Sequence, residues 1–165
     1  MLLFTTSINA QRSEKINMII RQAKKKDLGE ILRIMEYWNM HHVPSEEMPE
    51  LDISCFFIAE ENGKIVGASG YKMISPEVGK TTLLGVDPEE AGKGIGMALQ
   101  QARLKKMHEL GAKKVITNAD RPDTIAWYKK HFGYYEVGKL KKIHSFGRDD
   151  IDEWTTIEMN LDKYI

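Results

Sequence analysis

The stretch Val86-Asp-Pro-Glu-Glu-Ala-Gly-Lys-Gly-Ile-Gly-Met-Ala-Leu99 decides the fold of this chain. A short apolar run over 83–86 opens it and is typical of a strand, which should end at Asp87-Pro88. Three glycines at alternate positions follow and lead into a helical pattern whose apolar side holds Ile95, Ala98, Leu99 and Ala102. A strand, a glycine-rich turn and a helix N-terminus together direct several backbone N–H groups at one point, which suits a phosphate.

The spacing of these glycines narrows the kind of phosphate site. The Walker pattern is absent because Lys93 is followed by Gly94 and not by Ser or Thr. The dinucleotide pattern G-x-G-x-x-G also fails, since its last position falls on Met97 or Leu99. What remains is G-x-G-x-G preceded by Val-x-Pro. A tight strand-to-helix turn without a ligand is the alternative that these residues leave open.

The loop resembles the pyrophosphate loop of the GNAT superfamily, the acetyl-CoA-dependent N-acetyltransferases, whose usual form is V-x-P-x-x-[QR]-x-x-G-x-G-[AGK]. The match runs through Val86, Pro88, Gly94 and Gly96. It departs at Ala91, where the superfamily usually has Arg or Gln. One side-chain contact to the phosphate is therefore expected to be missing here, while the backbone amides remain.

A second motif of the same superfamily follows at the usual distance. The stretch 113–118 is typical of a β-branched strand that ends in an Asn, and a short helix from Pro122 should end at Gly133. This helix resembles the pattern A-I-x-x-Y-x-K-x-G-F, with Thr124 in place of the alanine and Tyr128 as the tyrosine. Its ending, 132–134, is one residue longer than the common form. With two motifs in the right order, the chain is identified as a member of this superfamily from about Asn17 to the C-terminus.

Length and charge fit one domain. At 165 residues the chain can bury about two thirds of its unfolded surface. We expect an N-terminal extension over residues 1–16, whose order the sequence leaves open, and a single domain over 17–165. Lys plus Arg and Asp plus Glu number 24 each, so no net charge favours nucleic acid or an anionic membrane as a partner.

Cysteine, histidine and apolar patterns exclude several classes. The single cysteine, Cys55, rules out an intrachain disulfide and a cysteine-rich zinc site. Its apolar neighbours favour a buried strand position over a redox or nucleophilic role. None of the five histidines has metal-ligand spacing, so no metal is predicted. Because no run approaches the ~18 apolar residues of a membrane span and the leader lacks signal-peptide features, we expect a cytoplasmic protein.

The remaining patterns predict the order β-α-β-β-β-α-β-α-β-β, as in the superfamily. Asp27 should cap the first helix with Glu30 in a capping box, and Asn62-Gly63 predicts a two-residue hairpin turn. The resemblance implies an α+β fold, a mostly antiparallel mixed sheet of about seven strands flanked by helices, with a splayed parallel pair at its centre. Strands are expected over 16–21, 54–60, 64–73, 81–86, 113–118, 134–143 and 154–161, and the middle helix over 94–110.

Acetyl-CoA is the co-substrate that the resemblance implies. Its pantetheine arm should enter the gap of the splayed pair and pair with the main chain near Leu84 and Val86. Gly85 either forms a bulge that opens this gap and aims an N–H at the thioester oxygen, or packs against an aromatic ring. Asn118 either bonds the pantetheine arm or caps a turn. The predicted cofactor-binding residues are Leu84, Gly85, Val86, Ala91, Gly92, Lys93, Gly94, Ile95, Gly96, Met97, Asn118 and Tyr128.

The chemistry of acetyl transfer needs a neutral amine, a stabilised oxyanion and a proton for the CoA thiolate. Tyr128, matching the superfamily's tyrosine, is the candidate catalytic acid, because a phenol is protonated at neutral pH and is close in acidity to an alkyl thiol. Packing on the sheet is its alternative role. The central strand offers no Glu as a base, and none of the groups that should border the acceptor cleft is singled out: His41, His42, His144, Asp149, Asp150 and Glu153.

Two functions follow from the resemblance. The first is an N-acetyltransferase that moves an acetyl group from acetyl-CoA to a primary amine of a small molecule, peptide or protein. The second is a non-catalytic module of the same fold that binds CoA or an acyl-CoA as a sensor or scaffold, an option that the missing contact at Ala91 and the missing strand Glu keep open. The identity of the acceptor, the general base and the formation of a homodimer are left open.

Overall fold

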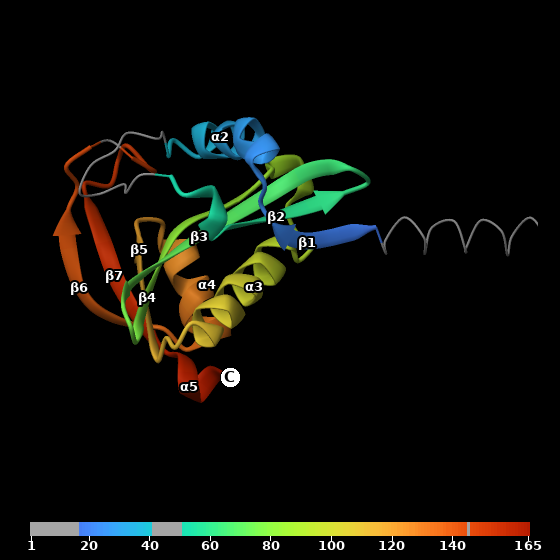
Figure 1. Ribbon diagram of the computed structural model, residues 1–165. Helices are drawn as coiled ribbons and strands as arrows, with labels where there is room; N and C mark the ends of the chain where they lie inside the picture. Colours follow the sequence, from blue (N-terminus) through green and yellow to red (C-terminus); the bar gives the residue numbers. More distant parts are fainter. Residues whose placement is uncertain (1–16, 41–50, 145) are drawn as a thin grey trace, which may run out of the picture.

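The computed structural model describes residues 17–40, 51–144 and 146–165 (Figure 1). The predicted extension over 1–16 and the candidate bases His41 and His42 lie outside these residues. The predicted order of elements is confirmed, with a short helix added at the C-terminus. The elements are β1 Met18–Gln22, α2 Leu28–Tyr37, β2 Phe56–Glu61, β3 Lys64–Ser75, β4 Val78–Val86, α3 Ile95–Glu109, β5 Lys114–Ala119, α4 Pro122–Phe132, β6 Tyr135–Lys141, β7 Glu153–Asn160 and α5 Leu161–Tyr164.

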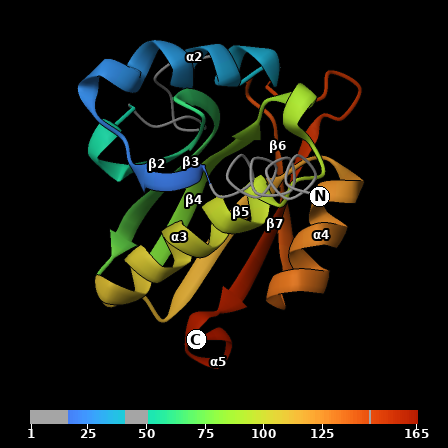
Figure 2. The ribbon, with the colours of Figure 1, turned by 90° about the vertical axis from the view of Figure 1, so that its right-hand side faces the viewer.

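The seven strands form one mixed sheet in the order β1-β2-β3-β4-β5-β7-β6, and α2 covers one face of it while α3 and α4 cover the other (Figures 1 and 2). Every strand pair described is antiparallel except β4 with β5, at the centre. The expected α+β fold class is therefore confirmed. In the part of the chain that the structure describes, no helix is long and apolar enough to cross a membrane.

The helices bury apolar stripes on both faces of the sheet. On one face, α2 contributes Ile31, Ile34 and Met35, which are at most 2% exposed. Leu28 and Leu32, on the same helix, remain 39% and 37% exposed. On the other face, α3 and α4 pack a second cluster that includes Leu104, Met107, Ile125 and Phe132 against β5 and β7.

The central parallel pair splays apart, as expected. β4 pairs with β5 only from Val78 to Lys80, against 114–116. Beyond that point β4 continues to pair with β3 on its other side, and β5 with β7. The hydroxyls of Thr81 and Thr117 meet at 2.6 Å where the two strands separate. Residues 81–86 of β4 therefore present an open edge toward β5.

A β-bulge lies in β4 at Thr82 and not at Gly85. The β3–β4 register runs Gly70 to Leu83 and then Tyr71 to Thr81, which leaves Thr82 as the extra residue. Gly85 pairs regularly, and a Cβ there would lie 2.7 Å from Ile34 and 3.2 Å from the Trp38 ring. The prediction of a bulge at Gly85 is wrong, and the alternative, close packing against an aromatic ring, is correct.

The predictions for the hairpin turn and for the cap of the first helix had different outcomes. Asn62 and Gly63 both have positive φ, 51° and 79°, which confirms the two-residue turn between β2 and β3. Asp27 precedes α2, but its side chain does not cap that helix. Its carboxylate is buried and accepts from the Arg21 guanidinium at 2.8 Å and from the Lys24 N–H at 2.7 Å. The ion pair with β1 outcompetes the cap because a buried carboxylate is stabilised most by a charged donor.

Candidate active site

The backbone conformation of the loop between β4 and α3 requires glycine at two positions. Gly92 and Gly94 have φ of +82° and +80°, a region that L side chains rarely adopt, and a Cβ at either would meet nothing within 4 Å. Gly94 is the N-cap of α3, and the Ala98 N–H donates to the Gly94 carbonyl. The N–H groups of residues 94–97 therefore precede the first intrahelical donor and have no acceptor within the helix. This end of α3 can hold an anion.

A cleft of about 760 Å³ extends from this loop along the open edge of β4. It is bounded by the loop, by residues 81–86 of β4, by the end of β5 and by α4. All the predicted site residues line it except Gly85, which faces α2, and Lys93. The structure thus brings residues from four separate stretches of the sequence to one cavity, and their roles there remain predictions.

Lys93 is engaged by carboxylates next to the loop. Its ammonium group forms ion pairs with Glu90 and, at 3.5 Å, with Glu61. The hydrogen bond from Lys93 lowers the pKa of the half-buried Glu90, and the same bond raises the pKa of Lys93. Ala91, the position where the superfamily has a longer polar side chain, is exposed and lines the cleft.

Tyr128 packs in the core and also lines the cleft. Its ring packs against Trp127 and Tyr134, with ring centroids 5.0 Å apart in each case, and only 3% of the residue is exposed. The residue nevertheless lines the cleft, and its hydroxyl accepts a hydrogen bond from Arg103 at 2.7 Å. The phenol is therefore held by a specific polar contact at the cleft wall as well as by packing.

A buried polar chain runs beneath the point where β4 and β5 separate. Thr117 lies within hydrogen-bond distance of both Thr81 and, at 3.5 Å, the Tyr134 hydroxyl. Burial raises the pKa of Tyr134 to about 12. Gln100 on α3 donates to Tyr134 at 3.0 Å and accepts from Arg103. Sequence reasoning missed Arg103, although a signal existed: it lies eight residues after Ile95, on the buried stripe of α3.

Asn118 lies in β5 and points its amide oxygen at a neighbouring strand. The Thr156 hydroxyl on β7 donates to this oxygen at 2.7 Å. Asn118 lines the cleft, and among the residues described, its amide nitrogen has no acceptor within the protein. Because the oxygen is held, the N–H donors of Asn118 face away from Thr156 and are available to a ligand.

Two long-range contacts hold the wall of the cleft. The Trp38 indole donates to the Val86 carbonyl at 3.0 Å. Asp120 and Lys142 form an ion pair at 2.9 Å in which both side chains are less than 10% exposed. Lys142 also donates to the Phe146 carbonyl at 2.7 Å, so this pair ties the segment before β7 to the end of β5.

None of the described candidate bases lines the cleft. The pKa of Asp150 is lowered by hydrogen bonds from Arg148, and Asp149 accepts from Asn39 at 3.2 Å. His144 packs against Phe146 with ring centroids 5.3 Å apart. These groups are held in local contacts of their own. The described residues contain no cluster of three His, Cys, Asp or Glu side chains that could hold a metal ion.

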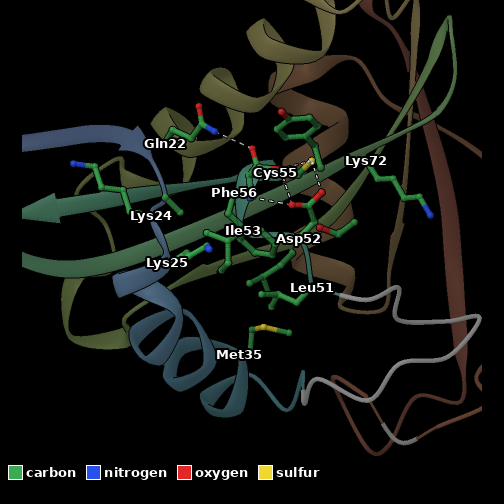
Figure 3. A pocket seen from close by; sticks show the side chains of 15 residues that line it. Gln22, Lys24, Lys25, Met35, Leu51, Asp52, Ile53, Cys55, Phe56 and Lys72 are labelled. Atoms are coloured by element: carbon green, nitrogen blue, oxygen red, sulfur yellow. Dashed lines mark hydrogen bonds between the residues drawn. The ribbon is translucent and has the colours of Figure 1, made fainter.

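A second cavity, of about 770 Å³, lies between α2 and the sheet (Figure 3). It shares the lining residues Thr82 and Leu83 with the cleft, so both spaces border the bulge. Asp52 and Cys55 lie together in it, with the Cys55 thiol 3.6 Å from the Asp52 carboxylate. Cys55 was expected to be a buried strand residue, but it ends a 3-10 turn before β2 and is partly exposed. Burial and the nearby Asp52 charge raise the pKa of its thiol, which disfavours a nucleophilic role.

The chain belongs to the Acetyltransferase (GNAT) family, which residues 20–134 match. Among similar solved structures is ribosomal-protein-S18-alanine N-acetyltransferase from Escherichia coli, at 17% identity and a TM-score of 0.68 over 87% of this chain and 94% of that one. The structure of YncA from Salmonella typhimurium with acetyl-CoA has 18% identity and a TM-score of 0.68, over 89% of this chain and 95% of that one. The structure of N-acetylglutamate synthase from Neisseria gonorrhoeae with CoA has 19% identity and a TM-score of 0.68, over 87% of this chain but only 35% of that protein. At these identities the structures establish a shared fold.

Proposed function

We propose that this protein is an N-acetyltransferase that moves an acetyl group from acetyl-CoA to a primary amine by direct attack. Membership of the acetyltransferase family supports transfer of an acetyl group in general. The observation that carries the finer proposal is the hydroxyl of Tyr128, which is held by Arg103 at the wall of a cleft that also contains the glycine loop.

The residues present fit a CoA molecule in this cleft. The N–H groups at the start of α3 would hold the pyrophosphate, since they lack intrahelical acceptors and their glycines leave them uncovered. The open edge of β4 and the amide of Asn118 offer hydrogen bonds to the pantetheine arm. The Val86 carbonyl already accepts from Trp38 and keeps one lone pair for a second donor. When bound, acetyl-CoA supplies the thioester that an amine attacks.

Tyr128 is the candidate acid for the leaving thiolate. Its phenol lines the cleft near the bulge of β4, where residues such as Thr82 and Leu83 face the same space. The bulge leaves Thr82 without a register partner on β3, and a backbone N–H at this position would stabilise a developing negative charge on the thioester oxygen. No general base is assigned.

The second cavity offers the acceptor a route to the thioester. It lies on the α2 side of the sheet, and Thr82 and Leu83 line both it and the cleft. Asp52 lies in this cavity, and hydrogen bonds from Ser54 lower the pKa of its carboxyl, which keeps it negatively charged. A carboxylate at this place attracts the ammonium group of an amine before it is deprotonated.

A screen of amines with acetyl-CoA, following release of free thiol, tests the proposal. Once an acceptor is found, Tyr128→Phe should lower kcat by about 10²–10⁴-fold, the usual contribution of general acid catalysis, with little change in CoA affinity. Tyr134→Phe is the matched control: it removes a hydroxyl that is equally buried but does not line the cleft, and kcat should stay within a few-fold of wild type.

Two outcomes would contradict the proposal at different levels. CoA binding without thiol release on any acceptor would favour the non-catalytic sensor or scaffold. Equal kcat for Tyr128→Phe and wild type on a genuine acceptor would leave acetyl transfer intact but remove Tyr128 from it.

A further inference from the structure

Arg103 places a fully buried guanidinium at the wall of the cleft. The residue has no exposed surface, and it comes from α3, the helix that follows the glycine loop. Its Nε donates to Gln100, Nη1 donates to the carbonyls of Leu83 at 2.6 Å and Gly70 at 3.1 Å, and Nη2 donates to the Tyr128 hydroxyl at 2.7 Å. All four acceptors are uncharged groups.

This guanidinium carries a positive charge without a counter-ion. In the part of the chain that the structure describes, no carboxylate forms an ion pair with Arg103, whereas the partly buried Arg21 is paired with Asp27 and Glu60. Burying an unpaired charge costs several kcal/mol even when its hydrogen bonds are made. An arrangement with this cost, at the wall of a cleft, points to a use for the charge.

We propose that Arg103 is a positioning residue for the acetyl transfer, and that it holds both the Tyr128 phenol and the bulge of β4 in their working geometry. The proposal rests on the proposed function. It assigns to one side chain the alignment of two groups that the reaction would need, the acid and the strand that faces the thioester.

The first task is to direct the proton of Tyr128. A guanidinium has donors and no acceptor, so the phenol oxygen must accept from Arg103 and cannot donate to it. The phenolic hydrogen is therefore turned away from Arg103, and among the described residues it has no protein acceptor. Because Tyr128 lines the cleft, this hydrogen is free for the leaving sulfur.

The charge of Arg103 also suits the proton transfer itself. When the C–S bond breaks, its electron pair stays on sulfur, the O–H bond of Tyr128 breaks and an S–H bond forms. The proton lost by the attacking nitrogen then returns to the phenolate through water, so the protons balance. During this sequence the fixed positive charge of Arg103 stabilises the negative oxygen in a low-dielectric site.

The second task is to hold the bulge. The β3–β4 register shifts immediately after the pair of Gly70 and Leu83, and Nη1 of Arg103 donates to the carbonyls of both residues. Two strands are thus tied together by the guanidinium where the ladder is interrupted. A lysine at this position has one nitrogen in place of three and cannot reach the phenol and both carbonyls in the same fixed plane.

Nitrogen-15 NMR of the arginine side chains tests the contact without any activity. Wild type should give a resolved, slowly exchanging set of Arg103 N–H signals, because the group is buried and hydrogen-bonded. Tyr128→Phe should shift the Nη2 signal and speed its exchange, while Tyr134→Phe should leave that signal in place. Unchanged Nη2 signals in Tyr128→Phe would overturn the proposal, whether or not the protein transfers acetyl groups.

Kinetics then test the role. Arg103→Lys should lower kcat by about 10- to 100-fold, a part of the ~10²–10⁴-fold that an acid contributes, with the Kd of CoA from calorimetry unchanged. In the Tyr128→Phe background, the same substitution should lower kcat by less, because only its effect through the bulge remains. Equal losses in both backgrounds would show that Arg103 does not act through Tyr128 and would overturn that part of the proposal. If Arg103→Lys does not fold, as judged by circular dichroism, the NMR comparison decides. Absence of thiol release by the wild type would reject the proposed function, not the contact.

Discussion

Gly94→Val offers the clearest separation between folding and CoA binding. The backbone of Gly94 has φ of +80°, where a side chain costs at least about 1–2 kcal/mol. A Cβ there meets nothing within 4 Å, so no clash adds to this strain. Because a domain is typically stable by about 5–15 kcal/mol, we expect the variant to stay folded with a modestly lower free energy of unfolding.

The effect on binding should be much larger. Valine relieves its strain by moving φ out of the left-handed region, and this re-aims the N–H groups at the start of α3. Each charge-assisted hydrogen bond is worth about 1.5–3 kcal/mol, so losing two removes about 3–6 kcal/mol. At about 1.4 kcal/mol per factor of ten, CoA affinity should fall by about 10²–10⁴-fold. Isothermal titration calorimetry with CoA measures this directly.

Gly133→Val is the matched control. Gly133 has φ of +68° at the C-cap of α4, its Cβ would also meet nothing within 4 Å, and it does not line the cleft. Both variants should lose similar stability in thermal unfolding, but only Gly94→Val should lose CoA affinity. Equal CoA affinities for the two variants would refute the placement of the pyrophosphate at this loop.

Three other substitutions test the surroundings of the site. Ala91→Arg should tighten CoA binding by at most about 1.5–3 kcal/mol, since it restores a charged phosphate contact at an exposed place; weaker binding would argue against the loop geometry. The hydrogen bond from Arg21 lowers the pKa of the Asp27 carboxyl. The stabilisation that this carboxylate gives the fold is therefore present above the ordinary Asp pKa and is lost as the pH falls through the lowered pKa. Asp27→Asn should therefore lower the free energy of unfolding at pH 7 by about 1.5–3 kcal/mol. Urea unfolding of this variant should also show a stability that changes less at acid pH than that of wild type. Gly147→Ala would place its Cβ 2.3 Å from the Asp120 carboxylate at a φ of +67°. If this breaks the buried ion pair of Asp120 with Lys142, the free energy of unfolding should fall by about 3–5 kcal/mol in chemical denaturation. An unchanged denaturation midpoint would show that the loop adapts.

Sequence reasoning worked best where the physical signal is local. The turn at Asn62-Gly63 follows from the positive φ that these residues tolerate, and the order of strands and helices follows from periodicity and from the punctuation by glycine and proline. The glycine loop could be read from the chain for the same reason, since Gly92 and Gly94 adopt a conformation that other residues avoid.

It failed where a residue had competing partners. Asp27 is an ordinary N-cap residue by type, yet Arg21, six positions away, provides a stronger buried partner. Gly85 is compatible with a bulge, but the bulge falls at Thr82, where the register of β3 and β4 shifts. Local propensity cannot rank such options, because the deciding energy comes from contacts between elements.

The sequence by itself determined the family, the order of the elements and the glycine-rich turn that opens α3, because glycine conformation and apolar periodicity act over a few neighbouring residues. Only the tertiary structure decided what surrounds Tyr128. Its partner, Arg103, lies 25 residues earlier in the chain, and the same guanidinium binds carbonyls on β3 and β4. A buried charge takes the acceptors that packing brings within reach, and which ones those are depends on how a helix lies across the sheet.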